Sequence, residues 1–216
     1  MSETLTKTRS YLVEFVPEDE EVYATLHALP STDKYITTND NAYIGHRIYQ
    51  SHGGAPIEYG IRRLCVYFDT SSIPATATVT SATLKIQFRA IYTNVAFDIV
   101  FQNGQPDYPH NPIEEADYYY DNYSDDEAVI NTDDIVTIAY NSLDLNTDWV
   151  TKAGETKIMI RGSHEIAAVA PTPGPNTNQW VSCGANRSGR KPTLVVEYSL
   201  VVPDYPIYPV IFPLET

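Results

Sequence analysis

The sequence predicts an all-β fold from three observations: short apolar or alternating segments, turn residues between them, and a composition rich in strand formers. Roughly eight to ten segments read as strands, with turn signals about 8–12 residues apart, the spacing of an antiparallel sandwich or barrel. The chain has 216 residues, with 17 Tyr and only 2 Met, which favours strands over helices. The length suits one large β domain or two small ones.

The clearest pair of strands lies between residues 62 and 90. Leu64–Phe68 is a continuous apolar run, whereas in Ala82–Phe88 apolar and polar residues alternate. Alternation with a period of two turns one set of side chains toward a core and the other toward water. Between the two runs, Asp69–Pro74 supplies short hydroxyl and carboxylate side chains that favour a turn.

Other segments show weaker strand patterns. We expect strands at 11–16, 33–36, 42–48, 95–101, 135–140, 155–162, 179–183 and 193–199. The segment 142–152 fits either a helical turn or a strand. Trp149 and Trp180 are expected to anchor the core rather than to bind a ligand.

Charge and hydropathy exclude several classes of protein. The net charge is −14, from 14 Lys and Arg against 28 Asp and Glu. Nucleic-acid binding is disfavoured, because neutralising phosphates needs a basic face. The first residues, MSETLTKTRSYLVEF, lack the apolar stretch of a signal peptide. No run of about 18 apolar residues occurs, so no membrane span is predicted.

The two cysteines, Cys65 and Cys183, both fall in expected strands. A disulfide-stapled secreted domain would contain more cysteines. Buried free thiols are therefore the favoured interpretation, and a single cross-strand disulfide is the alternative.

Both ends of the chain differ from the body. Residues 1–30 are expected to form an N-terminal extension, either an added edge strand or an arm that docks on a partner, and a helix from Glu18 to Leu26 is a competing interpretation. Residues 31–200 are the expected β domain. In residues 201–216, Pro203, Pro206 and Pro209 recur every three positions, which favours polyproline II over a ladder strand.

This C-terminal arm is also strongly apolar. Its apolar residues include Tyr205, Ile207, Tyr208, Ile211 and Phe212. Because exposed apolar surface is a liability in water, we expect the arm to dock on its own domain or on a neighbouring chain.

Residues 103–134 form a long acidic and tyrosine-rich excursion from the strand pattern. Long loops in compact domains are usually functional or disordered. The side chains of Asp117, Asp121, Asp125 and Asp126 could supply hard oxygen ligands to a structural Ca²⁺, although the EF-hand spacing is absent. A solvated acidic loop is the simpler interpretation.

The tyrosines of the excursion suggest a contact surface. Tyr118, Tyr119, Tyr120 and Tyr123 could stack against sugar rings or anchor a protein interface, where Tyr is enriched. The interface interpretation is slightly favoured.

No motif for catalysis is present. The five histidines are scattered without zinc-site spacing, and neither a nucleophile elbow nor a phosphate-binding glycine loop occurs. Paired carboxylates of the glycosidase type remain open among so many acids. The sequence therefore favours a non-enzymatic protein with no required cofactor.

One family resemblance accompanies these patterns. The segment Arg63–Leu84, RLCVYFDTSSIPATATVTSATL, resembles the core signature of the DNRLRE domain, a family related to carbohydrate-binding module family 96. Arg190–Tyr198 is similar to its closing strand, Asp33–Ile36 to its opening one, and Trp149 with Lys157–Arg161 to its penultimate strand. The resemblance covers residues 30–199 and implies an antiparallel jelly-roll β-sandwich in a single domain, with extended N- and C-terminal arms outside it.

Two functions are compatible with these features. The favoured hypothesis is a virion-associated structural and recognition protein, such as a phage capsid decoration or tail accessory protein. It would dock through its arms onto other protein subunits, as a homo-oligomer. The alternative is a carbohydrate-binding or cell-surface adhesion module that acts outside the cell, as the resemblance implies.

Overall fold

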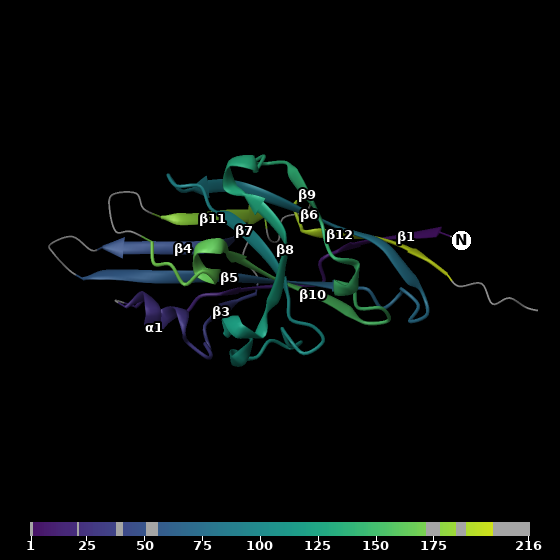
Figure 1. The fold of residues 1–216 in the computed structure, drawn as a ribbon, viewed down its shortest axis with the longest axis horizontal. Coiled ribbons are helices and arrows are strands. Elements are labelled where there is room, and N and C mark those ends of the chain that lie inside the picture. Colours follow the sequence, from purple (N-terminus) through teal and green to yellow (C-terminus); the bar gives the residue numbers. More distant parts are fainter. Residues whose placement is uncertain are drawn as a thin grey trace, which may run out of the picture.

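The computed structural model describes residues 2–20, 22–37, 41–50, 56–171, 178–184 and 189–200. Antiparallel strands dominate these residues and the helices are short, which confirms the all-β prediction (Figure 1). No helix in the described part of the chain has the length and apolar character needed to cross a membrane.

The described residues form the following elements. The strands are β1 (Ser2–Thr8), β2 (Tyr11–Phe15), β3 (Tyr35–Ile36), β4 (Asn41–Gln50), β5 (Ile57–Asp69), β6 (Thr78–Tyr92), β7 (Asp98–Asn103), β8 (Ser124–Asn131), β9 (Tyr140–Asp144), β10 (Glu155–Gly162), β11 (Gln179–Gly184) and β12 (Thr193–Ser199). The helical segments are α1 (Tyr23–His27), α2 (Ser163–Ile166) and the 3-10 turns η1 (Glu115–Tyr118), η2 (Tyr120–Asn122), η3 (Thr132–Asp134) and η4 (Thr147–Trp149).

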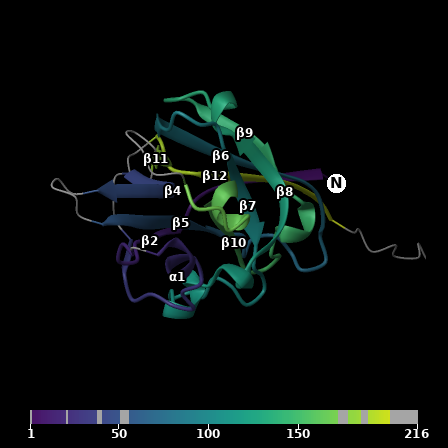
Figure 2. The same cartoon turned by 60° about the vertical axis from the view of Figure 1, so that its left-hand side comes forward.

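The strands form a strongly curled sheet in which neighbours follow the order β1-β12-β6-β11-β4-β5-β10-β7-β8. Strand β5 is long enough to pair with β4 along residues 57–62 and with both β2 and β10 along its second half. The sheet curls around its core, and Figure 2 shows the curl from a second side.

The main core collects alternate residues from the central strands, as the period of two predicts. In β6, Leu84, Ile86 and Phe88 are fully buried in it. In β5, successive residues divide between two cores: Leu64 enters the main core and Cys65 enters a smaller one beneath the acidic excursion. Burial on both faces explains why this strand is apolar without alternation.

The N-terminal residues belong to the sheet, which agrees with the added edge strand, one of the two alternatives for residues 1–30. Strand β1 pairs with β12, and β2 pairs with both β5 and β3. The predicted strand at 11–16 is confirmed as β2, and the competing helix is present in shortened form as α1. Strand pairing satisfies the backbone groups that a detached arm would leave to water.

Two other local predictions are wrong. Residues 135–140 were expected to be a strand, but the strand there, β9, begins only at Tyr140. The acidic excursion contains β8, which pairs with β7 and was not expected.

The thiol prediction is confirmed, since Cys65 and Cys183 are free and buried. Burial raises the pKa of both thiols, that of Cys183 to about 12.

A candidate binding groove on the β4–β11 face

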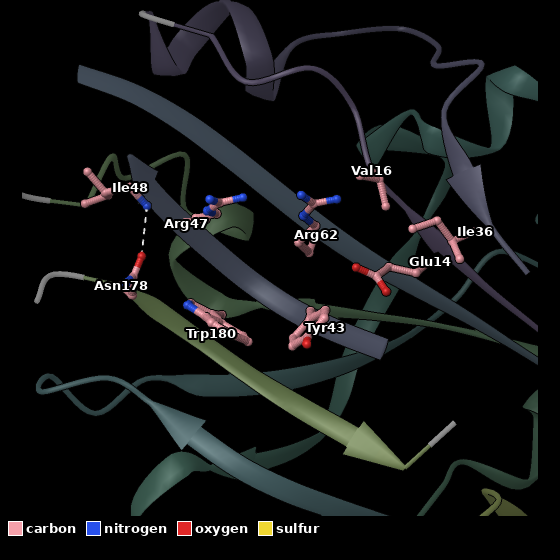
Figure 3. A pocket seen from close by; sticks show the side chains of 9 residues that line it. All are labelled: Glu14, Val16, Ile36, Tyr43, Arg47, Ile48, Arg62, Asn178 and Trp180. Carbon is pink, nitrogen blue, oxygen red and sulfur yellow. Dashed lines mark hydrogen bonds between the residues drawn. The ribbon is translucent and has the colours of Figure 1, made fainter. Parts of the chain in front are cut away.

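A groove of about 550 Å³ lies on the β4–β11 face of the described residues (Figure 3). This volume lies within the range of small-molecule sites, about 300–1,000 Å³. Strands β2, β3, β4, β5 and β11, with the residues next to them, supply its walls. The lining residues are Glu14, Val16, Ile36, Tyr43, Arg47, Ile48, Arg62, Asn178 and Trp180.

One side of the groove is aromatic. Trp180 stacks on Tyr92, with ring centroids 4.1 Å apart and an interplanar angle of 19°, and meets the edge of Tyr43 at 4.6 Å. The ring of Tyr92 is 46% exposed, and Trp180 Nε1 has no hydrogen-bond partner. Aromatic faces that stay partly open suit ligands with flat apolar surfaces.

Strand pairing brings these rings together from distant parts of the sequence. Trp180 on β11 lies directly opposite Tyr92 on β6 and opposite Gly45 on β4. Gly45 has a φ of +113°, and a Cβ there would lie 2.2 Å from the carbonyl oxygen of Gln179. Only glycine therefore allows β11 to approach β4 so closely at the position of Trp180.

The other side of the groove is charged. Glu14 on β2 is only 2% exposed, and its Oε2 has no hydrogen-bond partner. Its carboxyl group points toward Arg62 and Tyr43 (Figure 3). Burial raises the pKa of Glu14 to about 7, although the charge of Arg62 and a hydrogen bond from the backbone N–H of Tyr43 oppose the shift.

The groove is therefore cationic on an acidic protein. Its charged residues are Arg47, Arg62 and a Glu14 carboxyl that is about half protonated near neutral pH, whereas the whole chain carries −14. A local positive potential attracts anionic groups, and guanidinium groups bind carboxylates through a fork of N–H donors.

A second charged cluster lies inside the protein. Arg63 on β5 and Arg161 on β10 flank Glu165 on α2, and all three are at most 2% exposed. Arg63 Nε and Glu165 Oε1 are 2.9 Å apart, and Arg161 Nε lies 3.7 Å from the same oxygen. Burial alone would raise the pKa of Glu165, but the two guanidinium charges outweigh it and hold the pKa below its usual value.

This cluster ties the acidic excursion and α1 to the sheet. Arg63 donates to the carbonyl of Tyr118, and its guanidinium lies 3.7 Å from the centre of that ring. Arg161 Nη1 donates to the carbonyl of Tyr120 at 2.9 Å. His27 Nε2 lies 2.8 Å from the carbonyl of Glu165. The cluster thus supports the fold, and its charged groups are closed to solvent.

Of the four tyrosines predicted to form a contact surface, two are buried and two are partly exposed. Tyr118 and Tyr123 lie in the small core with Phe15 and Cys65, so they do not belong to a surface. Tyr119 and Tyr120 are partly exposed, with ring centroids 5.0 Å apart, and they stay a candidate contact. The sequence pattern missed the burial because a run of tyrosines has no period that separates inside from outside.

Among the aspartates proposed for Ca²⁺, the three whose side chains are described, Asp117, Asp121 and Asp126, do not belong to a group of three or more potential metal ligands. Asp117 is buried and accepts hydrogen bonds from the backbone N–H groups of His110 and Glu114, and its Oδ1 lies 2.7 Å from His110 Nδ1. Asp126 accepts a hydrogen bond from Gln102, and Asp121 is exposed. The side chain of Asp125 lies outside the described part. Across the described residues no group of three or more potential ligands is close enough to hold a metal.

The two tryptophans differ from each other in their agreement with the prediction. Trp149 is 1% exposed and anchors the core as expected, whereas Trp180 belongs to the groove, which corrects its assignment as a core anchor. The docking-arm residues Tyr205, Ile207, Tyr208, Ile211 and Phe212 lie outside the described residues. The groove itself was not predicted, because its walls join only when β2, β4, β5 and β11 are assembled.

No protein-family model matches the chain, and no sequence among characterised proteins matches it either. The groove and the fold therefore carry the functional proposal.

Proposed function

We propose that this chain is a non-enzymatic structural and recognition protein that binds other subunits of an assembly. The observation that carries the proposal is the groove on the β4–β11 face, which combines partly exposed aromatic rings with Arg47 and Arg62. Aromatic residues and Arg are the side chains enriched at the energetic centres of protein interfaces. A virion-associated role, as a capsid decoration or tail accessory protein, is the form of this function that we favour.

The chemistry of the groove supports binding rather than catalysis. Its titratable groups are Glu14, Tyr43, Arg47 and Arg62, and they do not include a nucleophile paired with a base. Cys65 and Cys183 are fully buried with raised pKa values, which makes them poor nucleophiles.

Sedimentation velocity over a range of protein concentrations tests the assembly role. We expect the full chain to form a species larger than a monomer, and a chain that ends at Leu200 to lose it. A full chain that remains a stable monomer, and that behaves the same after the truncation, would contradict the proposal.

A carbohydrate-binding role is the second candidate, and the stacked pair of Trp180 and Tyr92 favours it, because sugar rings pack on aromatic faces. This role is also the one implied by the resemblance to the DNRLRE family, with its jelly-roll sandwich and an extracellular or cell-surface location. On a glycan array we expect Tyr92→Ala, which removes the ring stacked on Trp180 beside the groove, to abolish binding, and Tyr140→Ala, an exposed site on β9 away from the groove, to retain it. Absence of binding by the unmodified chain to every glycan would remove this candidate.

A further inference from the structure

We propose that the groove on the β4–β11 face binds the proline-spaced C-terminal segment, residues 201–216, of a second copy of this chain. The inference rests on the proposed assembly function and names the partner of the same groove. It combines the lining of the groove with the sequence of the segment that follows the last described residue, Leu200.

The spacing of the prolines matches the aromatic side of the groove. A polyproline II helix has three residues per turn, so Pro203, Pro206 and Pro209 would lie along one of its edges. Segments of this type dock onto grooves lined by aromatic side chains, where a preformed extended helix loses little conformational entropy. Tyr43 and Trp180 line the groove, and Tyr92 stacks on Trp180 beside it, with ring centroids 4.1 Å apart.

The charges of the two surfaces are complementary. The segment contains Asp204 and Glu215 and no Lys or Arg. The groove presents Arg47, which is exposed, and Arg62, which is partly exposed. Pairing of Asp204 with Arg47 would fix the direction in which the segment lies, because opposite charges set the register of an interface.

The groove also holds polar atoms that lack partners. Glu14 is 98% buried, since its exposed fraction is 2%, yet its Oε2 accepts no hydrogen bond. Buried polar atoms are normally satisfied, so such an atom in a groove points to a missing donor. The segment supplies hydroxyl donors in Tyr205 and Tyr208, and Trp180 Nε1 could in turn donate to one of its carbonyl groups.

The path of the chain favours a second copy over the same chain. Strand β12 ends beside the first residue of β1, with Ser199 opposite Ser2. Figure 1 places this end of the molecule on the right, away from the end of β4 and the start of β5 on the left. The end of β12 is therefore remote from the end of β4 that carries Arg47, which favours docking into the groove of a second copy. Reciprocal exchange between two copies would close a dimer, and one-way docking would extend a chain of subunits.

A charge-swap experiment on the full chain tests the contact. The dissociation constant of the oligomer is measured by sedimentation for Arg47→Glu, for Asp204→Arg and for the chain with both changes. We expect each single change to weaken association by about tenfold or more, the effect of losing a charge-assisted hydrogen bond, and the double change to restore most of it. Lys85→Glu, an exposed site on β6 outside the groove, is the matched control and should leave association unchanged.

A competitor distinguishes this inference from the assembly role itself. A synthetic peptide with the sequence of residues 201–216, added in excess, should dissociate the oligomer, and a peptide with Pro206→Ala and Pro209→Ala should do so less effectively. If the chain oligomerises but neither the peptide nor the charge changes affect it, the groove is not the docking site, and the assembly role stands. If the chain is monomeric at every concentration, both the inference and the assembly role are overturned.

Discussion

The groove places the carboxyl group of Glu14 near Arg62, and the interior cluster places that of Glu165 between Arg63 and Arg161, yet the two carboxyl groups behave in opposite ways. Glu165 contacts Arg63 at 2.9 Å, and the guanidinium charges hold its pKa below the usual value. For Glu14, the effect of burial exceeds the charge of Arg62, and the pKa rises to about 7. Direct contact with a counter-charge therefore decides whether the pKa of a buried carboxyl group is lowered, which favours the ionised form, or raised, which favours the protonated form.

The comparison separates a structural cluster from a binding surface. In the interior, Arg63 donates a hydrogen bond to the carbonyl group of Tyr118 and Arg161 donates one to the carbonyl group of Tyr120, so the charged residues join elements of the fold. Glu14 and Glu165 each keep one carboxyl oxygen, Oε2, without a hydrogen-bond partner, but only Glu14 lines a groove, where Tyr43 and Trp180 lie nearby. Arginine and glutamate thus stabilise the fold in the interior cluster, whereas in the groove they line a surface that is open to a ligand.

The largest expected effect comes from breaking the interior cluster. Replacing Glu165 with Gln leaves two buried guanidinium groups without their counter-charge, and we expect the free energy of unfolding to fall by about 3–5 kcal/mol. Urea unfolding measures the loss. Glu197→Gln, an exposed site on β12, is the control and should stay within about 0.5 kcal/mol of the unmodified protein. A loss below about 1 kcal/mol at Glu165 would contradict a stabilising role for the cluster.

The next effect is a pH dependence that originates beside the cluster. His46 is 2% exposed, and burial lowers its pKa from 6.5 to about 4. Between these two values the unfolded chain binds more protons than the folded one, so stability falls as the pH decreases from 6.5 toward 4. The shift corresponds to about 3 kcal/mol over the window. The difference in the free energy of unfolding between the parent and His46→Gln, measured at several pH values, should change across this window by about that amount. A difference that does not vary with pH would contradict the lowered pKa of His46.

The smallest expected effect is the pH dependence that Glu14 in the groove gives to stability. Its sign is opposite to that of the His46 effect. Because the pKa of Glu14 rises from 4.5 to about 7 on folding, its contribution to stability is present below pH 4.5 and is lost as the pH rises through 7. We expect Glu14→Gln to stabilise the protein at pH 8 by about 1–2 kcal/mol, less than the full shift because the groove opens to solvent. Equal stability of variant and parent at pH 8, measured by thermal unfolding, would contradict the raised pKa.

Local patterns accounted for much of the fold. The alternation in Ala82–Phe88 identified the buried face of β6, since strand periodicity is a property of a few consecutive residues. The apolar run in β5 identified a strand but could not reveal that its two faces enter different cores. The wrong strand at 135–140 reflects the same limit: Val136 and Ile138 fit a strand by type, yet both are exposed, and Ile138 has a positive φ of 65°.

The candidate site depended on contacts that no local pattern contains. Trp180 contacts Tyr92 and Tyr43 only because β11 lies between β6 and β4. The positive φ of Gly45, which lets β11 approach β4, cannot be recognised in the sequence. The acidic and tyrosine-rich excursion was predicted to be a binding site from its composition alone. In the structure its most buried members, Asp117 and Tyr118, hold the excursion in place.

By itself, the sequence determined the all-β class, most of the strands, the buried thiols and the proline spacing of residues 201–216, because these follow from short-range periodicity and composition. The tertiary structure decided which side chains face a cavity and which carboxyl group meets a counter-charge. Those outcomes depend on the register and order of strands that are far apart in the chain, and the energies of burial and of ion pairing are set only once the strands are in place.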